Sequence, residues 1–170
     1  MATELTSANV KVTATSTFSN ALDLSTITDT LRLPIVHAFT NGTGADKAEI
    51  TWHDQRTLAK ETADNLDLAG GLSHAFGTAT FTKIKALIIQ NTSTATGLVL
   101  HVGGAASNAV STLTAATNDV VVVGAGGTLV LTAPTDGYVV TAGSADVLKV
   151  YNPHAETAVT YDIVVIGEGT

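Results

Sequence analysis

The chain of 170 residues contains no cysteine, which excludes disulfide bonds and thiol chemistry. Basic residues are also scarce, with eight Lys and Arg against fifteen Asp and Glu, and the formal net charge is −7. Phosphate contacts need clustered Lys and Arg, and the eight basic residues are scattered along the chain. The sequence therefore argues against a nucleic acid partner.

Long apolar runs are missing as well. No segment approaches the roughly 18 continuous apolar residues of a membrane-spanning helix. The first residues, MATELTSANVKV, lack the basic region and apolar stretch of a secretory signal. We therefore expect no membrane partner, and we expect the protein to be made in a cytoplasm.

Charged residues make up only 14% of the chain and aromatic residues 5%, whereas apolar residues reach 45%. The apolar fraction is large enough for a core built mainly from Val, Ile, Leu and Ala. The polar surface must then come mostly from Thr, Ser and Asn. The length suits one domain, or a small domain with an arm.

The stretch Phe81–Gly104 contains the clearest strand signals. It begins with alternation, with Phe81, Lys83 and Lys85 on one side, and becomes apolar on both faces at 86–89. That pattern is typical of a strand buried on both faces. A polar segment and a second apolar run follow, so we predict a hairpin with a long loop.

Further apolar runs recur every 8–12 residues with Gly or Pro between them, a spacing that favours an all-β fold. The last run, Ala158–Ile166, resembles the central one, so we expect it near the middle of a sheet, with Ile88 and Val165 in the core. Helical stretches that could connect parallel strands are missing. We predict an antiparallel β-sandwich, jelly-roll-like, with an N-terminal strand or arm.

The N-terminal part predicts that extra strand. Residues Ala8–Thr17 alternate between apolar and polar side chains, so we assign 1–17 to an N-terminal arm or edge strand and 18–170 to one β-sandwich domain. Ser19–Leu33 is rich in β-branched residues, which favours short strand pieces with a turn over a helix. Pro34 is expected to end this element.

No histidine pattern indicates a metal or catalytic site. The five histidines form no HxH, HxxxH or HExxH pair, and zinc sites normally show closer ligand pairs. His53 and Asp54 are adjacent, but neighbouring residues in a strand point to opposite faces, which disfavours a base oriented by a carboxylate. We expect Trp52 to be buried or at a subunit contact, and Asp54 and Arg56 to form a surface ion pair or a turn.

Two other patterns are weak. Gly124–Gly127 precedes a strand where a dinucleotide site would need a helix, so these glycines are expected to turn a hairpin. Asp64 and Asp67 offer too few oxygen ligands for a calcium loop, and Asp136 and Asp146 lie in turn-like segments. We therefore predict no catalytic, cofactor-binding or metal residues, no cofactor and no enzymatic activity.

The block WHDQRTLAKETADNLDLAGGLSHAFGTATFTKIKALIIQNTS at 52–93 resembles small virion-associated structural proteins of tailed bacteriophages. The segments VGGAASNA, GGTLVLTAPTDGYVVTAGSADVLKVYN and VTYDIVVIG are also similar to those proteins, so the likeness covers roughly 42–167. The matching signature residues are Arg56-Thr57-Leu58, Leu66–Leu72, Phe76-Gly77, Phe81 and Ile84–Ser93.

The resemblance implies a capsid decoration (cement) protein, a homotrimer that binds the major capsid protein. It would be made in the bacterial cytoplasm and located on the outer capsid surface of the virion. Residues Ala8–Thr17 could then dock by adding a strand to a neighbour's sheet. Alternatives are a tail, neck or fibre protein, a glycan- or receptor-binding module, and, least supported, a hydrolase.

Overall fold

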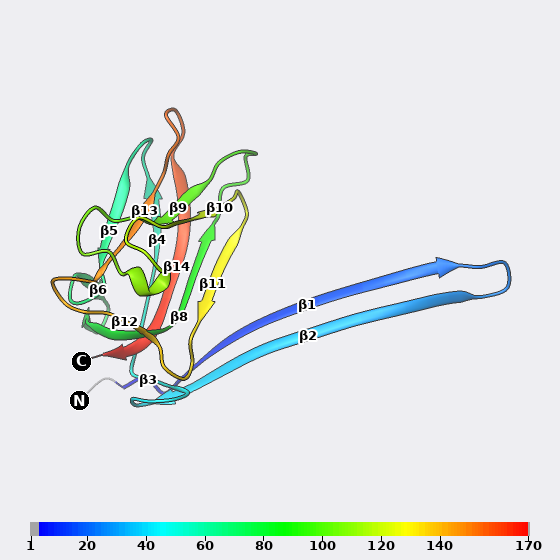
Figure 1. Ribbon diagram of the computed structural model, residues 1–170, viewed down its shortest axis with the longest axis horizontal. Coiled ribbons are helices and arrows are strands. Elements are labelled where there is room, and N and C mark those ends of the chain that lie inside the picture. Colours follow the sequence, from blue (N-terminus) through cyan, green and yellow to red (C-terminus); the bar gives the residue numbers. More distant parts are fainter. Residues whose placement is uncertain (1–3, 170) are drawn as a thin grey trace.

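The computed structural model describes residues 4–169, which form strands, loops and one short 3₁₀ helix, η1 (Ser111–Leu113) (Figure 1). These residues contain no α-helix. The prediction of an all-β fold with antiparallel sheets is thus confirmed. The part of the arm prediction that concerns residues 1–3 lies outside the described residues.

Two larger sheets make up the body of the molecule, and all their strand pairs are antiparallel. One has the order β11-β8-β14-β4, with β12 beside β8, and the other has the order β10-β9-β13-β5. The strands of the first sheet are β4 (Ile50–Leu58), β8 (Phe81–Asn91), β11 (Thr128–Thr132), β12 (Tyr138–Val139) and β14 (Val159–Gly169). Those of the second are β5 (Ala63–Asp67), β9 (Leu100–Gly103), β10 (Val120–Val123) and β13 (Val147–Tyr151).

Side chains from both sheets share one buried cluster. Its largest fully buried members include Trp52, Tyr161, Phe81 and Leu148. A two-stranded sheet of β6 (Leu72–His74) and β7 (Gly77–Ala79) lies at the lower end of the body in Figure 1. The core is largely aliphatic, as the composition predicts.

The predicted hairpin between β8 and the following run is wrong. β8 and β9 belong to different sheets, so the polar loop between them crosses from one sheet to the other. The same holds for Gly124–Gly127, which connects β10 of one sheet to β11 of the other. Gly and polar residues mark both turns correctly, but local turn chemistry does not specify which strand pairs with which.

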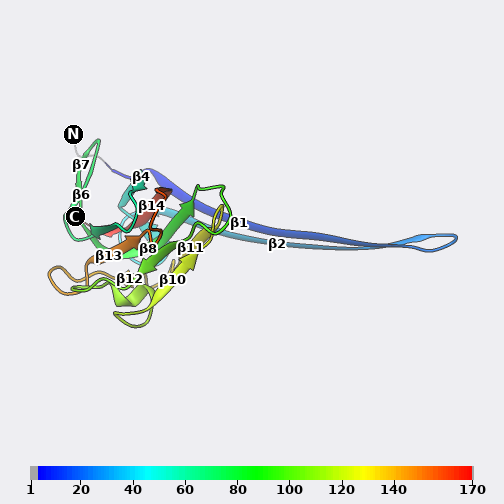
Figure 2. The same ribbon diagram turned by 90° about the horizontal axis from the view of Figure 1, so that it is seen from above.

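A long antiparallel ribbon projects from the body (Figures 1 and 2). It consists of β1 (Ser7–Ala21) and β2 (Thr26–Asn41), paired in continuous register from Ser7 with Thr40 to Ala21 with Thr26. We call the part of this ribbon from 11 to 36 the arm. A short strand, β3 (Lys47–Ala48), pairs with the end of β2 where the chain enters the body.

Pro34 does not end the element, contrary to the expectation. It lies inside β2 opposite Thr13, and the segment Ser19–Leu33 contains one turn between two long strands rather than several short pieces. At Pro34 the ribbon has only two strands, so β2 is an edge strand there, and a proline is tolerated because its missing N–H interrupts no central ladder. β1 (Ser7–Ala21) overlaps the predicted arm at 7–17 and projects together with β2.

The last strand, β14, lies between β8 and β4, as predicted, and Val165 is fully buried. Ile88 is only half-buried, because it lies on the opposite face of β8 from the main core, whereas its neighbour Ile89 points into that core. The sequence could not decide between two adjacent isoleucines in a run that is apolar on both faces.

We predict that Ile89→Ala lowers the free energy of unfolding by about 2–5 kcal/mol because it leaves a cavity in a closed core. Ile88→Ala should cost clearly less, because the half-buried site leaves no closed cavity. Denaturant melts of the two variants measure the difference. Equal losses would contradict the assignment of the two faces.

Candidate functional site: the arm and its root

The five histidines do not form one cluster, although His53 and His74 line the same cavity. His154 accepts a hydrogen bond from Val99 N (2.7 Å), and the His37 ring lies 3.3 Å from the Thr132 hydroxyl. Among residues 4–169, no group of three or more His, Asp or Glu side chains is placed to hold a metal ion.

The cluster around Trp52 is structural. Trp52 is buried and donates a hydrogen bond to Ser73 O (3.1 Å), while Arg56 pairs with Asp54 (3.0 Å). Burial of the tryptophan and the ion pair are thus confirmed. His53 is exposed and aligns with Val164 of β14, whose side chain lies outside the main core.

Asp64 and Asp67, which offer too few ligands for a calcium loop, make contacts within the protein. Asp64 accepts a hydrogen bond from the buried Tyr161 hydroxyl (2.9 Å) and lies 3.6 Å from Arg56. Burial, followed by the hydrogen bond to Asp64, raises the pKa of Tyr161 far above its usual range. Asp67 instead accepts from Ala69 N (2.9 Å). These contacts connect β4, β5 and β14.

A cavity of about 400 Å³ lies beside β4, β6 and β7. His53, His74 and the exposed Phe76 are among its lining residues, with Glu4 and Glu49 at the same opening. The walls combine apolar and acidic side chains with the hydroxyls of Thr51 and Thr78. Among the described residues, Thr51 Oγ1 is buried without a hydrogen-bond partner.

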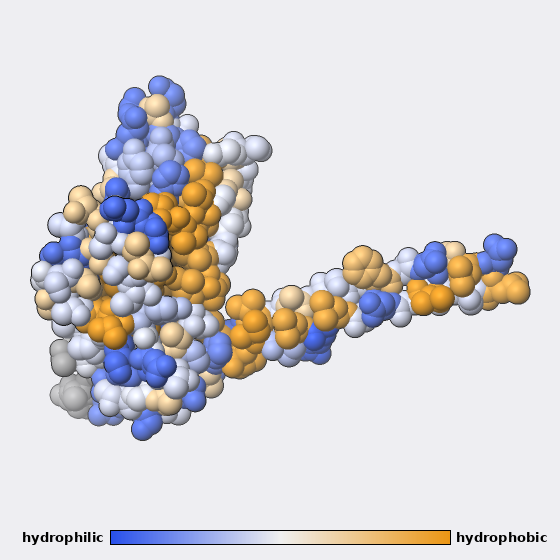
Figure 3. Space-filling model, in the orientation of Figure 1, coloured by the Kyte–Doolittle hydropathy of each residue, from blue (hydrophilic) through white to orange (hydrophobic). Residues whose placement is uncertain are grey.

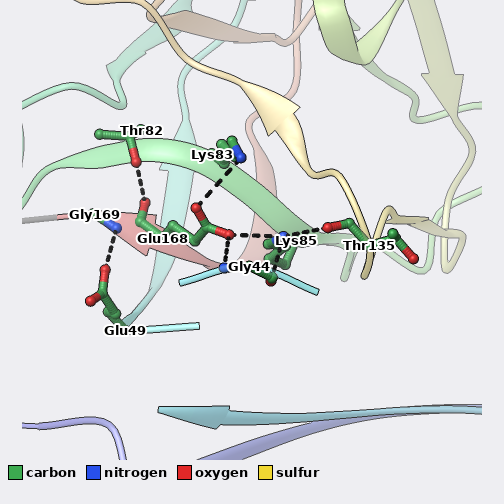
Figure 4. A network of polar contacts seen from close by, with 8 residues as sticks. All are labelled: Gly44, Glu49, Thr82, Lys83, Lys85, Thr135, Glu168 and Gly169. Atoms are coloured by element: carbon green, nitrogen blue, oxygen red, sulfur yellow. Dashed lines mark hydrogen bonds and ion pairs between the residues drawn. The ribbon is translucent and has the colours of Figure 1, made fainter. Parts of the chain in front are cut away.

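The densest polar network lies where the arm joins the body (Figure 4). Lys85 Nζ is fully buried and contacts three oxygens: Glu168 Oε1 (2.9 Å), Gly44 O (3.0 Å) and Thr135 O (3.0 Å). Gly44 N in turn donates to Glu168 Oε1 (2.8 Å). Lys83 Nζ lies 3.7 Å from the other carboxylate oxygen. We call Gly44, Lys83, Lys85, Thr135 and Glu168 the polar clamp.

Irregularities in the sheet place the two central side chains of the clamp. The β8–β14 register shifts between Ile166 and Gly167, so that Lys85 has no partner opposite it in the ladder. Bulges of this kind re-aim side chains. Gly167 permits the close approach, because a Cβ there would lie 2.1 Å from Lys83 O.

The clamp holds the loop that follows the arm. Gly44 lies between β2 and β3, where its N–H donates to Glu168 and its carbonyl accepts from Lys85. In the same loop, Asp46 N donates to Pro134 O (3.0 Å). Burial disfavours the ionised Glu168. The hydrogen bonds from Gly44 and Lys85 and the charges of Lys85 and Lys83 outweigh that effect and lower the pKa of this carboxyl.

An apolar contact completes the root of the arm. Val10 of β1 and Phe39 of β2 are buried against Ala86 and Ile166 on the outer face of the five-stranded sheet. Ile88, Val130 and Val164 pack against the same cluster but stay half-exposed. The root is therefore fixed to the body by an apolar contact and by the polar clamp.

The exposed apolar side chains of the arm lie mainly on one face. Cross-strand partners share a face, so the register places Val12 with Ile35, Ala14 with Leu33, Ser16 with Leu31, Phe18 with Asp29 and Asn20 with Ile27. The opposite face carries mainly Thr, Lys and Arg, and Val36 is its only large aliphatic residue. Figure 3 shows apolar patches along the arm and an apolar band on the body beside its root.

Neither the polar clamp nor the apolar face of the arm was predicted from the sequence. The alternation of Ala8–Thr17 identified one amphipathic strand, but β2 carries most of the large side chains of this face. The signal for the clamp was the basic pair Lys83 and Lys85 inside an apolar strand, together with Gly-Glu-Gly at 167–169. Pairing them requires knowing that β8 and β14 are neighbours.

Comparisons with other proteins add no family assignment. No protein-family model, no curated protein and no solved structure matches this chain. Within the described residues, no helix has the length and apolar character needed to cross a membrane.

We predict that Glu168→Gln lowers the free energy of unfolding by about 3 kcal/mol at pH 7, because it leaves the ammonium of Lys85 buried without a counter-charge. Because the folded-state pKa of Glu168 is lowered, its contribution is complete above its ordinary value of 4.5. The contribution is lost as the pH falls through the folded pKa. Urea melts from pH 7 to pH 3 should therefore show the difference from wild type shrinking toward low pH.

The matched control is Glu49→Gln, an acidic residue near the same network whose side chain, among the described residues, accepts one hydrogen bond, from Gly169 N (3.3 Å). It should change stability little at any pH. A Glu168→Gln variant as stable as the Glu49→Gln variant at pH 7 would contradict the role given to the clamp.

Proposed function

We propose that this protein is a structural component of a tailed bacteriophage virion, a decoration protein that binds the outer capsid lattice and stabilises it. Its partners are the major capsid protein and further copies of itself, with a trimer as the expected assembly. The resemblance of segments within 42–167 to small virion proteins supports this proposal. The arm is the observation on which it depends most.

We also propose that the body is a jelly-roll sandwich. In chain order, β4, β8, β11, β12 and β14 occupy the first sheet, and β5, β9, β10 and β13 the second. Successive strands of these two sheets cross from one to the other, except at the steps from β9 to β10 and from β11 to β12. Interleaving of this kind, around one shared core, supports a jelly roll over two separate hairpin sheets.

The arm supports an assembly role for a physical reason. A two-stranded ribbon in water is marginally stable, and this one exposes Leu31, Leu33 and Phe18 at 56%, 53% and 71%. Contiguous exposed apolar surface of this kind marks interaction sites. The clamp fixes the loop at its base to the body, so the arm extends in a defined direction.

Docking of Ala8–Thr17 by adding a strand to a neighbour's sheet is restricted to one edge of β1. One edge of β1 is hydrogen-bonded to β2 along its whole length, so only its other edge is open to a neighbour's sheet. The broad face of the ribbon offers more apolar surface than that edge. We therefore assign the docking contact to the broad apolar face of the ribbon and not to the edge of β1.

Cryo-electron microscopy of purified virions, with the protein identified by mass spectrometry, tests the location. Density for this body on the outer capsid, between major capsid subunits, is the expected result. Density at the portal, tail or fibre would replace the decoration role by a connector or adhesin role. Absence from virions would overturn the proposal.

Removing the arm tests its role in attachment. Val10 and His37 lie opposite each other, so replacing 11–36 by Asn-Gly closes the ribbon with a two-residue turn and keeps the root. We predict an unchanged body in thermal melts and at least tenfold weaker binding to undecorated capsids, because the apolar face assigned to the contact is removed. Equal binding in a co-sedimentation assay would contradict this role.

A further inference from the structure

We propose that the apolar face of the arm packs against the apolar face of the arm of a second copy of this chain. This inference deepens the proposed function, on which it rests for the place of assembly, because it names the partner of the arm. It is argued from the pattern of the ribbon, its continuity with a buried contact, its area and its charge.

One face of the ribbon is mainly apolar and the other is polar, as in a sheet that covers one side of a hydrophobic core. From the pair of Val12 and Ile35 to the pair of Asn20 and Ile27, one face is mainly apolar over about 30 Å. The reverse face is rich in Thr and carries Lys11 and Arg32, as expected for a surface in water. Such ribbons, packed with their apolar faces together around the axis of the expected trimer, bury those faces and leave their polar sides solvated.

The same face is already buried at the root. Val10 and Phe39 belong to it by register, and both lie in the cluster with Ala86 and Ile166. Exposure rises from 4% at Val10 to 39% at Val12 and 71% at Phe18. The apolar pattern therefore continues beyond the point where the protein's own body stops covering it, which indicates a second covering surface.

The area fits a contact between copies. The large exposed side chains of this face are Val12, Phe18, Ile27, Leu31, Leu33 and Ile35. Covering them would remove roughly 600 Å² per copy from water, so a pair of arms would bury about 1,200 Å², the lower limit of standard stable interfaces. A second arm also matches this face in length and width, because it is the same ribbon.

Charge and backbone chemistry disfavour a membrane or a nucleic acid as the partner of this face. Asp29 is the only charged side chain on this face between 12 and 35 and lies toward the free end, where it can stay at the rim of a contact. A membrane would leave the unpaired backbone groups at the ribbon edges without partners. Nucleic acid is disfavoured by the net charge of −7.

Leu33→Asp in the full chain tests the contact, with Thr30→Asp as the matched control on the opposite face of the same strand. Sedimentation velocity at micromolar concentration should show wild type and Thr30→Asp as oligomers. Leu33→Asp should shift the self-association constant at least tenfold toward monomer. Because Leu33 is half-exposed, its thermal melt should match that of the control, which excludes misfolding as the cause.

The absence of cysteine allows a second readout. Leu33→Cys should cross-link between copies with a short bis-maleimide, whereas Thr30→Cys should not. A monomeric wild type would overturn the inference, and so would an oligomer that is unaffected by Leu33→Asp. Wild type that binds lipid vesicles through the arm without self-associating would overturn it in favour of a membrane.

Capsid binding, measured in parallel, separates this inference from the proposed function. Oligomers that depend on Leu33 but do not bind capsids would support the arm contact and contradict the decoration role. Monomers that bind capsids through the arm would contradict the arm contact and leave the decoration role standing.

Discussion

The buried ammonium of Lys85 is the constraint on which the geometry of this molecule depends. A lysine in the interior needs acceptors for its three N–H groups and a counter-charge. Glu168, Gly44 and Thr135 supply them from three different segments of the chain. The bulged register of β8 and β14, the loop after the arm and the loop after β11 converge on this one group.

That convergence explains how a thin ribbon can leave the body in a fixed direction. An exposed two-stranded ribbon makes few contacts that could define its orientation. Here both polar groups of Gly44 are bound to the clamp, and Phe39 is buried against the sheet a few residues earlier. The rest of the arm exposes an apolar face that the protein's own body leaves uncovered. The fixed root and the uncovered apolar face beyond it both favour a role in assembly.

The sequence was sufficient for the features that depend on local pattern. Period-two alternation and Gly or Pro breaks identify an all-β chain, and the apolar run at 163–166 predicts the central position of β14. The same signals could not assign partners, because turn residues look alike whether a chain folds back or crosses to another sheet. This is why the predicted β8–β9 hairpin was wrong. The expected end at Pro34 was wrong for another reason, because an edge strand tolerates a proline.

The candidate site was harder to predict for the same reason. Lys85 and Glu168 are 83 positions apart, and their contact depends on a bulge that shifts the alternation of β8 by one residue. The apolar face of the arm becomes visible only when β1 and β2 are aligned, because Leu31 and Leu33 lie opposite Ser16 and Ala14. Long-range pairing, rather than composition, carries the functional information in this chain.

Hydrogen exchange measured by mass spectrometry across a range of protein concentrations tests the central claim that the arm requires a partner. We predict that amides of 12–35 exchange rapidly in dilute solution and become protected as the protein concentration rises, while the exchange rates of amides in β8 and β14 do not change. Strong protection of 12–35 in a monomer would show that the ribbon is stable alone. That result would contradict the account.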